Sequence, residues 1–214
     1  MRRILQAELL DLLPPDHPDA LHSRRDLRLI NRIMGNHRWI ARTVAPLLGP
    51  REIALEIGAG DGVLGLQLAA QSVAVDGLDL WPRPATWPAA RAWHSADLRA
   101  FGGYAGYPVI VGNLIFHQFN AEELAELGAA IRQSARVIIA CEPARQRLSQ
   151  VLMAVFGPPL GAAAVTQHDA RVSVAAGFRG DELSRALGLR PEEWDIRCGS
   201  TALGAYRMVA RRRG

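Results

Sequence analysis

The sequence contains no lysine, and all 25 of its basic residues are arginine. Because 21 acidic residues oppose them, the formal net charge is only +4. Proteins that bind nucleic acid usually concentrate positive charge on one face. An arginine-only set in a chain rich in alanine, glycine and leucine instead indicates a general compositional bias, so nucleic acid is not the expected partner.

Cysteine is also scarce, and the two residues present, Cys141 and Cys198, stand in apolar runs typical of buried free thiols. No spacing of residues indicates a metal site. No apolar run approaches the roughly 18 residues of a membrane span. Gln6 and Glu8 interrupt the N-terminal apolar residues too early for a signal peptide. A cytoplasmic protein without a metal is therefore expected.

The length and composition predict one globular domain, since the chain has 214 residues, of which 49% are hydrophobic and 21% charged. From Leu21 to Leu48 apolar residues recur at helical spacing, with a break at Gly35 and Asn36. We expect residues 1–48 to form an N-terminal helical cap and residues 49–214 to form the core.

Beyond the cap, apolar runs typical of strands alternate with helical patterns. This alternation predicts an α/β fold: a Rossmann-like, mostly parallel sheet of seven strands, with the ligand crevice at the carboxyl ends of the strands. The last two runs predict an antiparallel hairpin at one edge. The expected strands are Ile53–Ile57, Val73–Asp79, Arg91–His94, Val109–Gly112, Arg136–Cys141, Trp194–Cys198 and Ala205–Ala210.

Capping and breaking residues place the other elements. Asn120 caps the helix that follows it, and another helix is expected from Asp181 to Leu187. Prolines within residues 81–88 interrupt any helical pattern, so a helix in this segment is poorly specified. The run Gly157–Gly161 predicts a loop, and the segment that it begins extends to Phe178.

The first strand runs into three alternating glycines, Gly58, Gly60 and Gly62. Glycine tolerates a positive φ and lets a ligand approach the backbone closely. About 20 residues further on, Asp79 ends the second strand, where a carboxylate can accept hydrogen bonds from two ribose hydroxyls. The pattern therefore predicts a nucleoside ligand.

The charge and spacing of this turn disfavour a pyrophosphate. Val63 stands where a dinucleotide-binding turn has its third glycine, and Glu56 and Asp61 place negative charge at the turn. A pyrophosphate prefers the bare positive end of a helix. A cationic, phosphate-free nucleoside such as S-adenosylmethionine fits better, and a nicotinamide oxidoreductase is the weakest alternative.

Together, the acidic glycine turn, the strand pattern and the N-terminal helices resemble class I S-adenosylmethionine-dependent methyltransferases, over Arg51 to Arg211. Three shorter patches, within Asn31–Asn36, Gly112–His117 and Gln167–Arg179, are similar to small bacterial methyltransferases that act on small molecules. The resemblance implies that the cofactor is S-adenosylmethionine.

The resemblance also implies which residues contact that cofactor. The glycine turn would lie beneath the methionine portion, Asp79 would hold the ribose, and Asp97 would accept from the adenine amino group. For each carboxylate, a solvated strand end or a helix cap is the alternative. The expected cofactor residues are Glu56, Gly58, Ala59, Gly60, Asp61, Gly62, Asp79, Leu80, Trp81, Asp97, Leu98 and Asn113.

Methyl transfer requires mainly alignment and the exclusion of water, although a hydroxyl acceptor is helped by a base that titrates near pH 7. By the resemblance, His117 lies near the acceptor, and His168 with Asp169 lies in a loop expected to close over it. A packing histidine and a turn cap are the alternatives. The candidate substrate-binding residues on the N-terminal segment are Arg28, Asn31 and Asn36.

The residues after Asn113 indicate the kind of acceptor. In a sequence that resembles amino-methylating enzymes, two prolines and an aromatic residue would follow Asn113, whereas here Leu114, Ile115 and Phe116 follow it. An apolar wall at this point suits an aromatic acceptor. We expect a phenolic or polyketide-like small molecule of secondary metabolism, methylated at a hydroxyl or, alternatively, at carbon. The oligomeric state is left open between a monomer and a homodimer.

Two other functions stay open. An RNA or protein methyltransferase is the first alternative, and a non-catalytic binding or assembly protein is the second. For RNA, the N-terminal arginines would form a basic strip consisting of Arg24, Arg25, Arg28, Arg32, Arg38 and Arg42.

Overall fold

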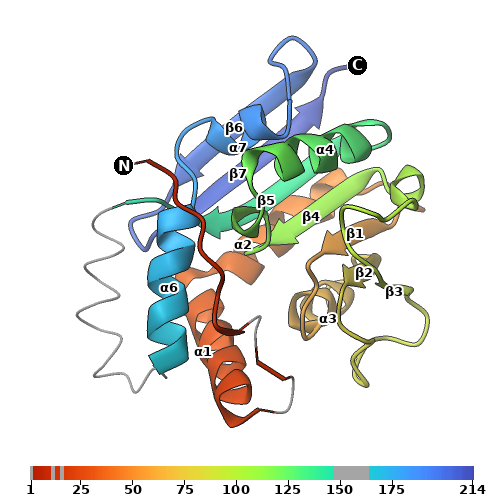
Figure 1. The fold of residues 1–214 in the computed structure, drawn as a ribbon. Coiled ribbons are helices and arrows are strands. Elements are labelled where there is room, and N and C mark those ends of the chain that lie inside the picture. Colours follow the sequence, from red (N-terminus) through yellow and green to blue (C-terminus); the bar gives the residue numbers. More distant parts are fainter. Residues whose placement is uncertain (1, 11–12, 15–16, 147–163) are drawn as a thin grey trace.

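A seven-stranded sheet forms the centre of the computed structural model, which describes residues 2–10, 13–14, 17–146 and 164–214 (Figure 1). The strand order is β3-β2-β1-β4-β5-β7-β6. β7 pairs antiparallel with β5 and β6, and the other pairs are parallel, which confirms the predicted sheet and its terminal hairpin. The strands are β1 (Ala54–Ile57), β2 (Val75–Asp79), β3 (Trp93–Ser95), β4 (Val109–Asn113), β5 (Val137–Pro143), β6 (Trp194–Ser200) and β7 (Ala205–Arg212).

Helices cover both faces of the sheet and bury its two sides separately. Leu55 and Ile57 of β1 pack with α4 (Ala121–Arg132) and α7 (Glu182–Ala186) on one face. Ala54 instead joins the cluster that contains residues of α2 and α3 on the other face. Successive side chains of a strand point to opposite faces, so one short buried strand supports both layers.

The N-terminal residues divide into two helices with different neighbours. α1 (Pro18–Met34) ends at Gly35, whose φ of 65° lies in the left-handed region, and α2 (Asn36–Val44) follows directly. Ile40 and Val44 of α2 are fully buried against the sheet. α1 packs instead against α6 (Ala164–Ala176), so α1 is the part of residues 1–48 that covers the carboxyl edge of the sheet (Figure 1).

α6 was missed by the sequence analysis, and the expected loop is wrong over its residues. The reason is that its buried face is partly polar, since Thr166 and Asp169 are both buried. The Thr166 hydroxyl hydrogen bonds to Ser23 and Asp26 of α1. A polar residue therefore stands in the buried face, where the sequence pattern of a helix requires an apolar one. The loop predicted at 157–161 lies outside the described residues.

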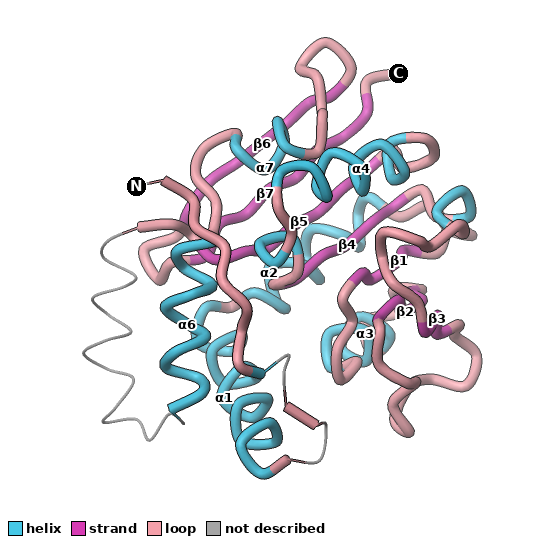
Figure 2. Tube along the Cα trace, viewed as in Figure 1, coloured by secondary structure: helices cyan, strands magenta, loops and turns pink. Residues whose placement is uncertain are grey.

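Other local predictions are confirmed. Asn120 forms a capping box with Glu123 at the start of α4. No helix separates β2 from β3, where the chain forms a long loop (Figure 2). Both cysteines are free, and Cys141 is buried as expected, whereas Cys198 is only half-buried. No described helix combines the length and apolar composition needed to cross a membrane. Within the described ranges, the other helices are α3 (Val63–Ala69), η2 (Ala45–Leu47), η3 (Tyr104–Gly106) and η4 (Phe116–Gln118).

The long loop between β2 and β3 places Trp87 behind the glycine turn. The buried indole donates a hydrogen bond to the Ala92 carbonyl at 3.1 Å. A Cβ atom added to Gly65 of α3 would overlap the Trp87 ring, because the helix and the indole are in close contact. Trp87 thus fixes the position of α3 and of the turn that precedes it.

Gly65→Ala should lower the free energy of unfolding by about 1–3 kcal/mol, because overpacking outweighs the higher helix propensity of alanine. Chemical denaturation measures the change. The control is Gly106→Ala, where an added Cβ meets no atom within 4 Å. The control should change stability by less than about 0.5 kcal/mol, and equal stabilities for the two variants would contradict the packing argument.

Candidate functional site

The glycine turn joins β1 to α3 at the carboxyl edge of the sheet. Gly58, Gly60 and Gly62 have φ values of 65°, 57° and 74°, so each adopts the left-handed conformation that other residues rarely take. This confirms the backbone geometry expected from their spacing. The backbone N–H groups of Gly58 and Ala59 donate to the Leu78 carbonyl of β2, which holds the turn against the sheet.

Asp79, at the end of β2, spans the turn. Its carboxylate accepts hydrogen bonds from the backbone N–H of Gly60 at 2.8 Å and of Trp81 at 2.9 Å. Burial raises the pKa of Asp79, and these backbone bonds act in the opposite direction. The Leu80 backbone N–H also bonds to this carboxylate. Because each carboxylate oxygen has two acceptor positions, Asp79 can still accept a ligand hydroxyl beside these three N–H groups.

Glu56 lies deeper in the same turn and is only 3% exposed. Its Oε2 atom has no hydrogen-bond partner among the described residues. Burial, with the charges of Asp61 and Asp79, raises the pKa of Glu56 well above its usual value. A buried acceptor without a donor is unfavourable, so this carboxyl group suits a ligand that brings a donor or a positive charge.

One face of α1 lies along this carboxyl edge. Arg24 stacks on the Trp81 ring at 4.4 Å, and Arg28 pairs with Asp61 at 2.8 Å. Their spacing of four residues places both on the same side of the helix. The structure therefore joins the predicted substrate residue Arg28 to the predicted cofactor residue Asp61. Arg24 was missed as a site residue, although its spacing from Arg28 could have identified it.

Three predicted asparagines meet beside the end of β4. The side-chain amides of Asn36 and Asn113 donate to the Oδ1 atom of Asn31, at 3.0 and 3.1 Å. The Oδ1 atoms of Asn36 and Asn113 are buried without a described partner. The cluster therefore offers two unused acceptors close to the strand end, where a donor-bearing ligand would satisfy them.

The remaining predicted cofactor residues lie toward β3. Leu80, directly after β2, is 72% exposed. Its apolar side chain is therefore available to pack against a planar ring. Asp97 pairs with Arg99 at 2.6 Å, and Arg99 holds the pKa of that carboxyl below its usual range. Leu98 is buried in the core cluster, so only its backbone can face a ligand.

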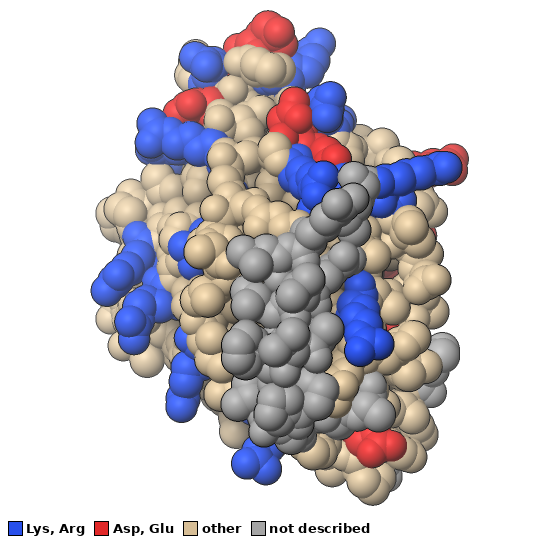
Figure 3. All heavy atoms as spheres, turned by 90° about the vertical axis from the view of Figure 1, so that its left-hand side faces the viewer, with Lys and Arg blue, Asp and Glu red and all other residues tan. Residues whose placement is uncertain are grey.

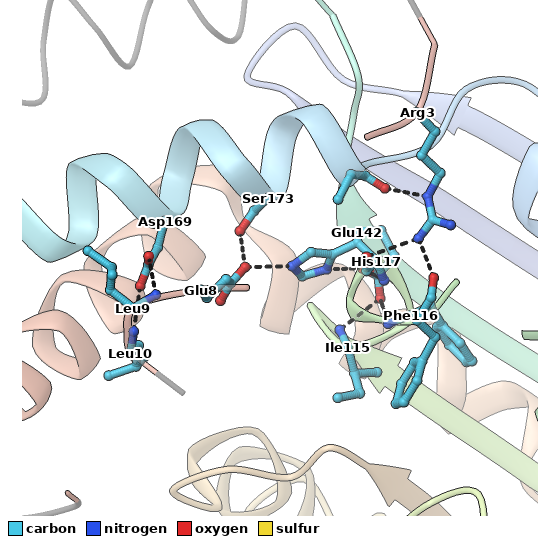
Figure 4. Close-up of polar contacts among 12 residues, drawn as sticks. Arg3, Glu8, Leu9, Leu10, Ile115, Phe116, His117, Glu142, Asp169 and Ser173 are labelled. Carbon is cyan, nitrogen blue, oxygen red and sulfur yellow. Dashed lines mark hydrogen bonds and ion pairs between the residues drawn. The ribbon is translucent and has the colours of Figure 1, made fainter. Parts of the chain in front are cut away.

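His117 lies in η4, directly after β4, and is only 3% exposed. Its Nδ1 atom lies 2.7 Å from Glu142, and its Nε2 atom lies 3.1 Å from Glu8 of the N-terminal segment (Figure 4). Burial alone would lower the pKa of His117, but the two carboxylates outweigh it and raise the pKa to about 10. A protonated ring with both nitrogens occupied does not fit the expected general base in this arrangement.

The other candidate pair, His168 and Asp169, lies on α6 and not on a loop. His168 is exposed. Asp169 is buried and accepts hydrogen bonds from the backbone N–H of Leu9 at 2.7 Å and Leu10 at 3.0 Å (Figure 4). Asp169 therefore anchors the N-terminal segment. Glu8 was also missed, because it is 109 residues from His117 and no local pattern marks it.

Comparison with known proteins places this geometry in context. No family model matches the sequence. The tRNA1(Val) (adenine(37)-N6)-methyltransferase of Edwardsiella ictaluri is 38% identical over 81 residues, which are 32% of this chain and 33% of that protein. The chain thus matches about a third of the length of this curated relative.

Solved structures resemble the whole chain. The plantazolicin methyltransferase BpumL, in complex with SAH, has a TM-score of 0.71 at 13% identity, and the match covers 95% of this chain and 93% of that one. Human N-acetylserotonin methyltransferase, in complex with SAM, has a TM-score of 0.62 at 12% identity, with 95% and 61% covered. The chain has the Rossmann-like fold of class I methyltransferases.

The pairing of His117 with two carboxylates should make stability depend on pH. Its pKa is raised to about 10 in the folded protein, against about 6.5 when unfolded. The stabilisation is therefore complete below pH 6.5 and lost as the pH rises through 10. Since one pKa unit corresponds to about 1.4 kcal/mol, the free energy of unfolding should fall by a few kcal/mol over this interval.

Chemical denaturation across this pH range, in wild type and in His117→Gln, measures the contribution. The fall with pH should be much smaller in His117→Gln. His168→Gln is the matched control, because His168 is exposed, and it should keep the wild-type dependence. The same dependence in wild type and His117→Gln would show that His117 is not held protonated.

Proposed function

We propose that this protein transfers a methyl group from S-adenosylmethionine to a small-molecule acceptor, at a hydroxyl of a phenolic or polyketide-like compound. The main observation is the group of three carboxyl groups around the glycine turn, formed by Glu56, Asp61 and Asp79. A phosphate-bearing nucleotide would be repelled there, whereas a ligand with an ammonium and a sulfonium would be attracted.

The candidate residues of the site would contact each portion of this cofactor. Asp79 would accept the ribose hydroxyls, and Leu80 with Trp81 would pack on the adenine. The unpaired Oε2 atom of Glu56 would accept from the amino group of the methionine portion, directly or through water. The bound cofactor would supply an activated methyl group.

The protein's own residues would position the acceptor and exclude water. α1 crosses the site, and Ile115 lies against the glycine turn, where an added Cβ on Gly58 would meet its side chain at 2.5 Å. An apolar wall at this point favours an aromatic or polyketide-like acceptor over a charged polymer. Alignment and dehydration account for most of the catalysis that such a transfer needs.

The partial match to a tRNA methyltransferase favours a second candidate, methylation of RNA. The contacts of two arginines in the expected basic strip disfavour RNA as the acceptor. Arg24 stacks on Trp81 and Arg28 pairs with Asp61, so both are engaged within the protein. On the face shown in Figure 3, arginines are dispersed, and acidic side chains lie among them, mainly at its upper end. A continuous phosphate-binding surface is not visible on that face.

Asp79→Ala should weaken the binding of S-adenosylhomocysteine by at least about 1 kcal/mol, roughly fivefold, because two ribose hydroxyls lose their acceptor. Isothermal titration calorimetry measures the affinity. Asp195→Ala, which removes an acid from β6 at the far edge of the sheet, is the control and should bind as wild type does. Unchanged affinity in Asp79→Ala would remove this residue from the site.

The acceptor class is tested with radiolabelled S-adenosylmethionine. We expect label to be transferred to phenolic compounds of low molecular weight in a panel that also contains unmodified tRNA and unfolded protein. Transfer to tRNA alone would establish the RNA alternative. Binding of the cofactor without transfer to any member of a broad panel would favour a non-catalytic protein of this fold.

A further inference from the structure

The N-terminal segment 2–10, here called the strap, runs along α6 and over η4 (Figures 1 and 4). The Ile4 backbone N–H donates to the Ala175 carbonyl at 3.1 Å. The Arg3 guanidinium donates to the carbonyl oxygens of His117 at 2.9 Å and Phe119 at 2.8 Å. With the two bonds to Asp169, these contacts hold the strap at both ends.

Between these anchors, the strap places one carboxylate against His117. The Glu8 side chain is only 13% exposed, and its Oε1 atom accepts from Nε2 of His117. The Ser173 hydroxyl of α6 donates to the same oxygen. Burial and the charge of Glu8 raise the pKa of Asp169, one turn earlier on α6, and the N–H groups of Leu9 and Leu10 act in the opposite direction. Glu8 is thus the group that occupies the outer nitrogen of His117.

The inner nitrogen of His117 is fixed by a different carboxylate. Glu142 is fully buried and accepts the backbone N–H groups of Ile115, Phe116 and His117 in addition to Nδ1. Glu142 accepts each of these bonds, so Nδ1 is the donor toward it. Burial opposes ionisation of Glu8, but the hydrogen bond and charge of His117 lower the pKa of that carboxyl, so Nε2 is a donor too. His117 is therefore a buried cation whose outer N–H is aimed at the strap.

This arrangement suggests a role for His117 that does not require it to accept a proton. Removal of the strap would leave the cationic Nε2–H without its carboxylate partner, two residues after Ile115, which lies against the glycine turn beside the proposed acceptor position. Such a donor binds an anionic oxygen more strongly than a neutral one. An oxygen that arrives ionised needs no base, so His117 would keep its proton throughout.

On the basis of the proposed function, we propose that Glu8 occupies the place of an anionic acceptor oxygen. The strap opens when a carboxylate or an acidic phenol replaces Glu8 at Nε2 of His117. The strap is then an internal competitor of the acceptor, and His117 is a positioning residue that selects acidic acceptors.

The test uses Glu8→Ala in the full chain, with the imidazole of His117 followed by NMR. Loss of Glu8 should lower the pKa of His117 by about one unit or more, because one of its two ionic partners is removed. Added acetate should restore the pKa, whereas acetamide, which has nearly the same shape and no charge, should not. Exchange of the Leu9 and Leu10 amide hydrogens should accelerate by at least about tenfold as the strap detaches.

Two results would overturn the proposal: a pKa of His117 that is unchanged in Glu8→Ala, or one that falls and does not respond to acetate. If Glu8→Ala does not fold, Glu8→Gln keeps the size of the side chain and should still lower the pKa of His117 and accelerate strap exchange. Glu126→Gln, a matched charge change on the exposed part of α4, should alter neither.

Calorimetry with S-adenosylhomocysteine separates this inference from the proposed function. Wild type and Glu8→Ala should bind it within about twofold of each other, because Glu8 does not touch the glycine turn. Failure of wild type to bind it would reject the proposed cofactor, whereas the acetate response alone decides whether His117 recognises anions.

Discussion

The burial of carboxyl groups around the glycine turn is the constraint on which the site depends. Glu56 is buried, lacks a donor for one oxygen and lies near the charges of Asp61 and Asp79. Left alone, such a group costs stability, since desolvated like charges repel one another. A cationic ligand would remove that cost. The cluster of carboxyl groups therefore favours the binding of a cationic ligand.

Elements distant in sequence complete the walls of the site. α1 provides Arg24, Arg28 and Asn31 along one helical face, while the strap and α6 enclose His117 from the other side. These contacts are mainly polar, in contrast to the apolar contacts between the helices and the two faces of the sheet. Polar contacts can be exchanged for contacts with a ligand at little net cost, so under our proposal an acceptor would displace the strap while the sheet stays in place.

The sequence predicts the sheet well because its signals are local. Apolar runs, glycine spacing and the cap at Asn120 each reflect the physical requirements of one element, and every expected strand is present. The cofactor turn is predicted for the same reason. α6 escaped detection because the polar residues Thr166 and Asp169 interrupt a buried face that also contains Val172. Glu8 escaped because its partner His117 is remote in sequence, and only the folded chain brings them together.

The most direct test of the central claim is calorimetric titration of S-adenosylmethionine at pH 7 in two buffers of different ionisation enthalpy. Because burial and its acidic neighbours raise the pKa of Glu56 in the free protein, binding of a cation should lower that pKa and release protons. We predict binding accompanied by proton release, detected as a buffer-dependent enthalpy. Absence of binding, or binding with the same enthalpy in both buffers, would contradict the account.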